Sequence, residues 1–144
     1  ADVPSISVDQ EIELSILMAM RGDYSTAESI LDRIINPSAE TRAVSDRQRA
    51  VVLYNLGITK YNTGKFEESL SAFQTAQQSQ ATSSGSLLSD NQMVLLHWFQ
   101  ANAHLKLNRP LQASAHLTYL AEGEGPIARQ SSAILDRLMQ THTE

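Results

Sequence analysis

Apolar residues recur every three or four positions through most of this chain, which is the spacing of one face of an α-helix. Between residues 50 and 76 this pattern predicts two helices joined by a short turn. The apolar positions are Leu53, Leu56 and Tyr61, with Tyr54 and Ile58 on the flank, in the first helix, and Phe66, Leu70, Phe73 and Ala76 in the second.

Two glycines sharpen this prediction. Gly64 follows Asn62 and Thr63 and suits the left-handed conformation that often ends a helix. Gly57 lies in the middle of the first helix, where glycine costs about 1 kcal/mol relative to alanine. We therefore expect a second helix to approach closely at Gly57, as in an antiparallel helical hairpin.

The same hairpin pattern occurs three times. Gly22 and Asn108 take the place of Gly64 in the earlier and later copies, and Ser15 and Ala101 take the place of Gly57. The hairpins cover about residues 8–36, 48–78 and 91–122. A final helix, about residues 126–140, has its apolar residues on one face and Pro126 at a favourable first position. Its polar residues Arg129, Asp136 and Arg137 are expected to face water, as in a capping helix.

The segments between hairpins are polar. We expect Pro37 to end the second helix, and residues 36–48 to extend the next helix backward from about Ala39. Residues 79–90 are rich in serine and predict a mobile loop. Leu87 and Leu88 interrupt its polarity, and we expect them to fold against the body of the protein.

The middle copy resembles one tetratricopeptide (TPR) repeat, from Ala50 through Gly57 and Phe66 to Ala76. The resemblance implies an all-α fold: a right-handed α-solenoid of three TPR-like helical hairpins plus a C-terminal capping helix, in a single domain over residues 1–144. The turn residues Gly22, Gly64 and Asn108 are 42 and 44 residues apart, whereas the family's interval is about 34. Regular TPR curvature is therefore not implied.

The resemblance also implies a concave surface, lined by the first helix of each hairpin, that binds a protein partner. The carried-over groove positions are Ile12, Ile16, Ala19, Met20, Val51, Tyr54, Ile58, Tyr61, Asn62, Leu95, Trp98, Asn102, Leu105 and Lys106. Most are apolar or aromatic, which favours an apolar peptide or an amphipathic helix as the partner.

Other interpretations of these residues stay open. They can form core, or the segment Val3–Val8 can fill the groove. The same apolar surface can also pair with another copy, making the chain a self-associating subunit of a homo-oligomer.

One activity of the family is excluded by the residues. Chaperone-docking TPR domains hold a peptide's C-terminal carboxylate with basic and amide side chains. The aligned positions here are Ile12, Ile16, Asn55, Leu95 and Phe99. Only Asn55 agrees, and burying a carboxylate against apolar side chains is costly. A chaperone C-terminal tail is therefore not the expected partner.

Composition and motifs exclude several further classes of function. The net charge of −5 and the lack of a basic stripe argue against nucleic acid. The longest apolar run, Met93–Phe99, is too short for a membrane span. No sequence motif of an enzyme or cofactor site occurs, so we expect no catalysis and no cofactor. We expect a module of a larger assembly protein. The sequence leaves its compartment open; a cytoplasmic or periplasmic portion of a larger or membrane-anchored protein is compatible with it.

The third hairpin carries three histidines. His97 and His104 share one helical face, and His116 approaches from the antiparallel helix. We interpret them as packing residues, because His97 and His104 occupy positions where the family places large side chains. A regulatory or enzymatic domain whose histidines bind a metal is the alternative.

Overall fold

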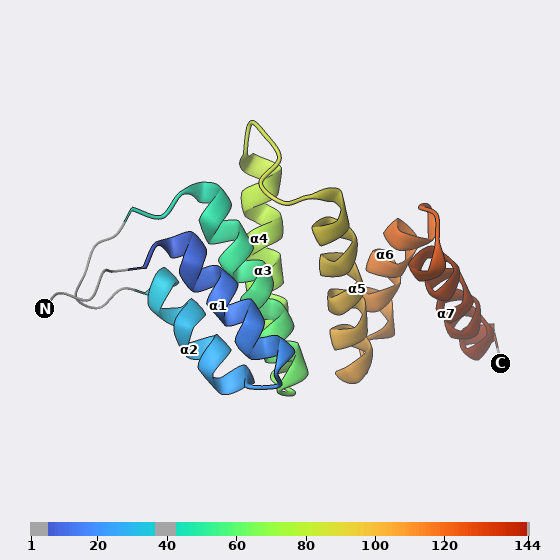
Figure 1. Cartoon of the computed structure of the whole chain (residues 1–144). Helices are drawn as coiled ribbons and strands as arrows, with labels where there is room; N and C mark the ends of the chain where they lie inside the picture. Colours follow the sequence, from blue (N-terminus) through green and yellow to red (C-terminus); the bar gives the residue numbers. More distant parts are fainter. Residues whose placement is uncertain (1–5, 37–42, 144) are drawn as a thin grey trace, which may run out of the picture. The chain divides into compact units, whose positions relative to one another are not determined.

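The computed structural model describes residues 6–36 and 43–143, and all regular structure within them is helical (Figure 1). The predicted all-α fold is thereby confirmed for this part of the chain. The helices are α1 (Val8–Met20), α2 (Tyr24–Ile35), α3 (Asp46–Asn62), α4 (Phe66–Thr82), α5 (Asp90–Lys106), α6 (Pro110–Ala121) and α7 (Pro126–Thr143).

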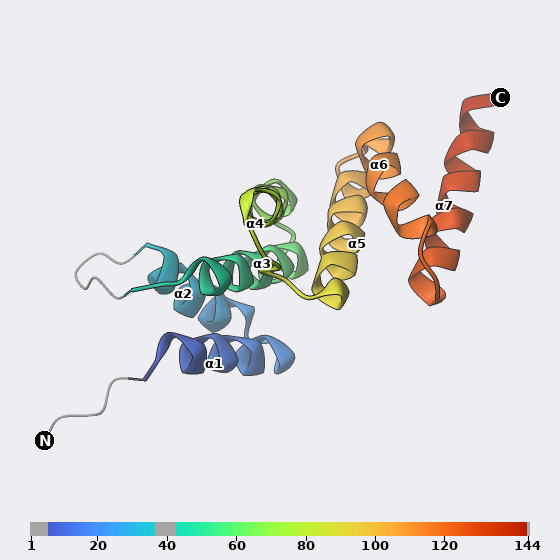
Figure 2. The same cartoon turned by 90° about the horizontal axis from the view of Figure 1, so that it is seen from above.

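The helices group into two compact units, Ala1–Leu88 and Ser89–Glu144. In the first unit α1 packs on α2, α2 on α3, and α3 on α4. Figure 2 shows α1, α2 and α3 stacked in this order, with α4 on the far side of α3. In the second unit α5 packs on α6, and α6 on α7. Each unit is thus built by successive packing of helices that are neighbours in the sequence.

Three hairpin turns have the same backbone conformation. Each has a residue with a left-handed backbone at its centre, and the next backbone N–H donates to a carbonyl five residues earlier, which is the Schellman arrangement. The central residues are Gly22 (φ 83°), Gly64 (φ 80°) and Asn108 (φ 60°). The bonds run from Asp23 to Met18 (2.9 Å), from Lys65 to Lys60 (2.8 Å) and from Arg109 to His104 (2.8 Å). The predicted left-handed conformations of Gly64 and Asn108 are confirmed.

Small residues occupy the same position in the first helix of each hairpin. Ser15, Gly57 and Ala101, each seven residues before a turn centre, are all buried. A Cβ atom at Gly57 would lie 2.6 Å from Cε1 of Phe73. Ser69 Oγ donates a 2.6 Å hydrogen bond to the carbonyl oxygen of Gly57. The close approach predicted at Gly57 is therefore confirmed, and α4 is the helix that makes it.

The first helix of each hairpin begins with the same capping box, a feature that the sequence analysis missed. A serine hydroxyl accepts from the backbone N–H three residues later, and the glutamine there accepts from the serine N–H. The pairs are Ser7 with Gln10, Ser45 with Gln48, and Ser89 with Gln92. The Ser-x-x-Gln spacing was a readable signal for these helix starts.

The linking segments differ from the expectation. α3 begins at Asp46, because Ser45 caps it, and residues 43–45 are not helical. Ala39 and Pro37 lie outside the described residues. α4 continues to Thr82, so the first part of the expected loop at 79–90 is helix.

The predicted folding-back of Leu87 and Leu88 is confirmed. Leu88 is buried and Leu87 is half-buried. The Gln80 side-chain oxygen accepts the backbone N–H groups of Leu87 (2.8 Å) and Leu88 (2.9 Å). One glutamine oxygen therefore accepts two backbone N–H groups of the loop.

An ion-pair cluster joins α2 to α3 near their turns. The Glu28 carboxylate accepts from Lys60 Nζ at 2.7 Å and from Lys65 Nζ at 3.1 Å. The hydrogen bond from Lys60 is the main reason that the pKa of Glu28 lies below its ordinary value. The side chains of Glu28 and Lys60 are both largely shielded from water, so this pair is screened less than a surface pair.

We expect Glu28→Gln to lower the free energy of unfolding by about 1 kcal/mol, because Lys60 would lose its shielded 2.7 Å partner and keep only the exposed Glu68 carboxylate at 3.7 Å. Urea denaturation followed by circular dichroism measures the change. Glu68→Gln is the matched control, since Glu68 is mostly exposed and lies 3.7 Å from the same lysine. Equal losses in both variants would contradict a special role for the shielded pair.

Candidate functional site

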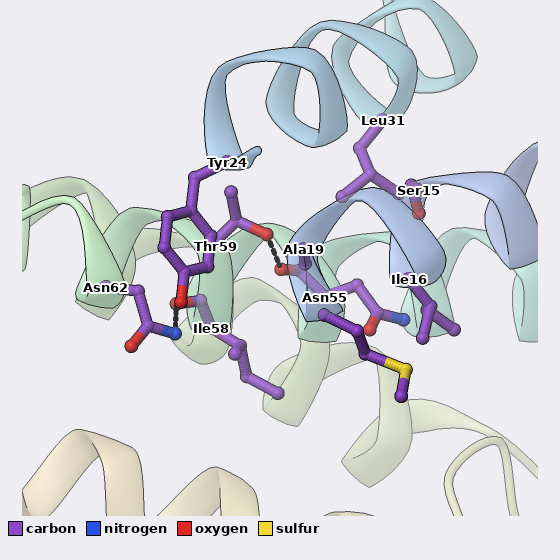
Figure 3. A pocket seen from close by; sticks show the side chains of 10 residues that line it. Ser15, Ile16, Ala19, Tyr24, Leu31, Asn55, Ile58, Thr59 and Asn62 are labelled. Atoms are coloured by element: carbon purple, nitrogen blue, oxygen red, sulfur yellow. Dashed lines mark hydrogen bonds between the residues drawn. The ribbon is translucent and has the colours of Figure 1, made fainter. Parts of the chain in front are cut away.

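The first unit has an open pocket of about 260 Å³ between α1, α2 and α3 (Figure 3). The lining residues are Ser15, Ile16, Ala19 and Met20 from α1, Tyr24 and Leu31 from α2, and Asn55, Ile58, Thr59 and Asn62 from α3.

The rim of this pocket is apolar and open to solvent. The Met20 side chain is 78% exposed, and Ile16 is exposed beside it. Ile58 and Ala19 are half-buried, and Leu31 is buried within the core. Exposed aliphatic and thioether side chains around a concavity are typical of a surface that another protein covers.

The polar side chains of the pocket are already bonded to their own helices. Asn55 Nδ2 donates to the Val51 carbonyl and Asn62 Nδ2 to the Ile58 carbonyl, both at 2.9 Å. Thr59 Oγ1 donates to the Asn55 carbonyl at 2.8 Å. None of the ten lining residues is charged. The pocket thus has the chemistry to accept an apolar side chain, and no cationic group that would hold a carboxylate.

The pocket brings together four of the predicted groove residues: Ile16, Met20, Ile58 and Asn62. Ala19, from the wider set of carried-over positions, lies among them.

The other predicted residues of the first unit lie elsewhere. Ile12 and Tyr54 are buried and present almost no surface, and Val51 packs against the core. The Tyr54 ring meets that of Phe73 edge-on at 6.3 Å. Tyr61 packs edge-on against Phe66 at 5.3 Å. These side chains stabilise the unit rather than line its pocket.

In the second unit, the predicted residues Leu95, Trp98, Asn102 and Leu105 are all half-buried on α5. Trp98 and Leu105 pack against the buried cluster of Ala101, Ala113 and Leu117, which also receives residues of α7. Asn102 Nδ2 donates to the Trp98 carbonyl at 2.8 Å. Lys106, at the end of α5, is exposed.

Four residues that line the pocket were not expected there from the sequence: Ser15, Tyr24, Leu31 and Thr59. Ser15 was expected only at the crossing of the two helices of its hairpin. For Thr59 a signal existed, because it follows Asn55 by four residues and so shares its helical face. For Tyr24 and Leu31 no local signal existed, since their place depends on how α2 packs against α1 and α3.

No family model, curated protein or solved structure matches this chain. Its function is therefore inferred from its own residues and geometry.

The three histidines of the second unit do come together, as the spacing predicted. His97 Nδ1 lies 2.9 Å from His116 Nδ1, and the His104 and His116 rings stack at 5.7 Å. Burial, with smaller contributions from His97 and His104, lowers the pKa of His116 to about 4. Burial also lowers the pKa of His97. Across residues 6–36 and 43–141, no group of three or more His, Cys, Asp or Glu side chains has metal-binding geometry.

None of the described helices combines the length and the apolar composition needed to cross a membrane. This agrees with the absence of a span expected from the sequence. Residues 3–5 of the proposed groove-filling segment lie outside the described residues.

Proposed function

We propose that this chain is a non-enzymatic protein-interaction module of the TPR kind, which binds the apolar face of a partner's amphipathic helix in the pocket between α1, α2 and α3. The repeated features of the hairpins support this proposal: equivalent turns, capping boxes, and small residues at the same position of each first helix. They are what a stack of related helical hairpins requires.

We propose further that the hairpins belong to a right-handed α-solenoid in which α7 is the capping helix. α7 packs Ile134, Leu135 and Leu138 inward. Arg129, Asp136 and Arg137 are exposed on it. This division between an apolar and a polar face is what the last helix of a solenoid needs.

The observation that carries the binding proposal is the exposed apolar rim formed by Ile16 and Met20 around an uncharged concavity. An amphipathic helix carries apolar anchors at every third or fourth position, and one anchor can enter such a pocket while its neighbours contact the rim. Methionine adapts its shape to different anchors, which favours Met20 as a contact residue.

A display library of helical peptides with apolar residues at i, i+3 and i+7 tests this proposal. We expect wild-type protein to select binders, and Met20→Glu and Ile16→Glu each to weaken them at least roughly tenfold, because the new carboxylate would be desolvated on binding. Fluorescence anisotropy with labelled peptides measures the affinities.

Leu111→Glu is the matched control. Leu111 is 74% exposed on α6 and lies far from the pocket in sequence, so this variant should bind as the wild type does. Circular dichroism confirms that all three variants remain helical. A library that yields no binder, or binders indifferent to both pocket changes, contradicts the proposal. Tyr54 is unsuitable for such a test, because its replacement would disturb the core.

A further inference from the structure

The outer face of α1 is a second apolar surface, distinct from the pocket. Leu14 is 38% exposed and Leu17 is 54% exposed. Gln10 and Arg21, also exposed, continue the line in both directions. The spacing of 4, 3 and 4 residues places these four side chains along one edge of the helix. We call this line the α1 outer face.

The equivalent positions of α3 show how this face of a helix is covered inside the unit. Counted back from the turn residues Gly22 and Gly64, Leu14 corresponds to Leu56, and Leu17 to Thr59. Leu56 and Thr59 are buried, and Leu56 belongs to the core cluster that contains Leu31 of α2. A preceding helix therefore covers this face on α3, whereas on α1 it is open.

The last helix does not share this feature. Apart from Met139, the exposed residues of α7 in its described part are polar or small, and they include Arg129 and Arg137. A terminal helix with a polar outer face needs no cover. α7 thus offers the α1 outer face no matching apolar surface, and head-to-tail chains of copies are not favoured.

The charges along α1 favour a second copy as the occupant. Acidic Glu13 is exposed in the N-terminal half of α1, and basic Arg21, also exposed, caps its C-terminal end. Asp9 is not available for this pairing, because its carboxylate accepts a hydrogen bond from Gln48 of α3. Antiparallel pairing of two copies of α1 places Leu14 opposite Leu17, and Arg21 opposite Gln10 and beside Glu13. Parallel pairing would instead bring Glu13 near Glu13 and Arg21 near Arg21 of the other copy. The antiparallel arrangement also aligns the two helix dipoles favourably.

We propose that the outer face of α1 pairs with the same face of a second copy, giving a symmetric antiparallel dimer. The surface is self-complementary, as a two-fold interface requires. α1 has 13 residues and is about 20 Å long, so the interface is small and the dimer is weak. This dimer leaves the pocket rim free, and it does not depend on the proposed peptide binding.

Sedimentation velocity over a series of protein concentrations tests the proposal. We expect a reversible monomer–dimer equilibrium, with a dissociation constant of roughly 10–100 μM. Leu14→Glu with Leu17→Glu should weaken dimerisation at least roughly tenfold. Leu111→Glu and the pocket variant Ile16→Glu are controls that should dimerise as the wild type does. Because all these positions are exposed, unchanged circular dichroism is expected throughout.

Reversing the charges at Arg21 and Glu13 distinguishes this dimer from other modes of association. Arg21→Glu should weaken dimerisation roughly threefold to fivefold, since it places two carboxylates together. Adding Glu13→Arg to that variant should restore the wild-type constant. A wild-type protein that stays monomeric at every concentration overturns the proposal. A dimer whose dissociation constant does not change in the Leu14→Glu, Leu17→Glu variant also overturns it. So does an Arg21→Glu variant whose dissociation constant is not restored by Glu13→Arg.

Discussion

Replacing Gly57 by valine is expected to lower the free energy of unfolding by about 3 kcal/mol, as inserting side-chain atoms into a packed crossing does. Even the first added carbon would lie 2.6 Å from the Phe73 ring. Phe73 is fully buried and also meets the Tyr54 ring, so it has little room to move. The gain in helix propensity over glycine is less than about 1 kcal/mol and does not offset this clash.

The Phe73 ring provides the test of this explanation. In a Phe73→Ala background, the further change Gly57→Val should cost less than about 1 kcal/mol, because the space that the ring filled is open. Guanidinium denaturation of the four proteins, followed by circular dichroism, gives the coupling energy. Gly85→Val is the control for the substitution itself, since no atom would lie within 4 Å of its Cβ. Additive costs at positions 57 and 73 would refute the steric explanation.

The helices were predictable because their signals are local. Gly64 and Asn108 specify left-handed turns through their own backbone preferences. Pro126 starts α7 for a similarly local reason, because its ring is compatible with a first helical position. The start of α3 was misplaced because the polar composition of residues 36–48 outweighed Ser45, whose Ser-x-x-Gln spacing was the better signal.

The site was only partly predictable, because α3 has neighbours on several sides. Val52, Tyr54, Leu56 and Thr59 are all buried, although they point in different directions around the helix. Periodicity identifies an apolar stripe, but it does not say which edge of a broad stripe stays open. That depends on where α1 and α2 pack. Ile16 and Met20 remain exposed because α1 has a covering helix on fewer sides than α3 has.

The second unit contains an acid-sensitive cluster, and its stability is expected to fall as the pH decreases from neutral. The pKa of His116 is about 4 in the folded chain, against 6.5 for an ordinary histidine. Above pH 6.5 the imidazole is neutral in both states, so its contribution to folding does not change. As the pH falls below that value, the unfolded chain takes up a proton that the folded chain resists, and stability is lost until about pH 4.

Burial is the main cause of this resistance, and the imidazoles that face His116 add to it. His97 lies within hydrogen-bond distance, and His104 stacks on the ring from the same helix α5. On α6 itself, Tyr119 packs on His97 at 4.0 Å between ring centres. A second positive charge among these rings would be poorly solvated and would repel the first. The neutral pair, in which one imidazole donates to the other, is the form that the fold favours.

We expect the second unit to lose about 1 kcal/mol of stability between pH 7 and pH 5. The full shift in the pKa of His116 would cost about 2 kcal/mol over this range, and solvent screening reduces that cost because His116 is only half-buried. Trp98 is the single tryptophan of the chain and lies on α5, so its fluorescence during urea denaturation reports on this unit. His116→Leu should remove most of the pH dependence, because leucine does not titrate. The fold should accept leucine here, since the equivalent positions in the other hairpins are Ile30 and Ala72, which are apolar and buried. A wild-type stability that is flat over this range, or an equal decline in His116→Leu, would show that the imidazole cluster does not control it.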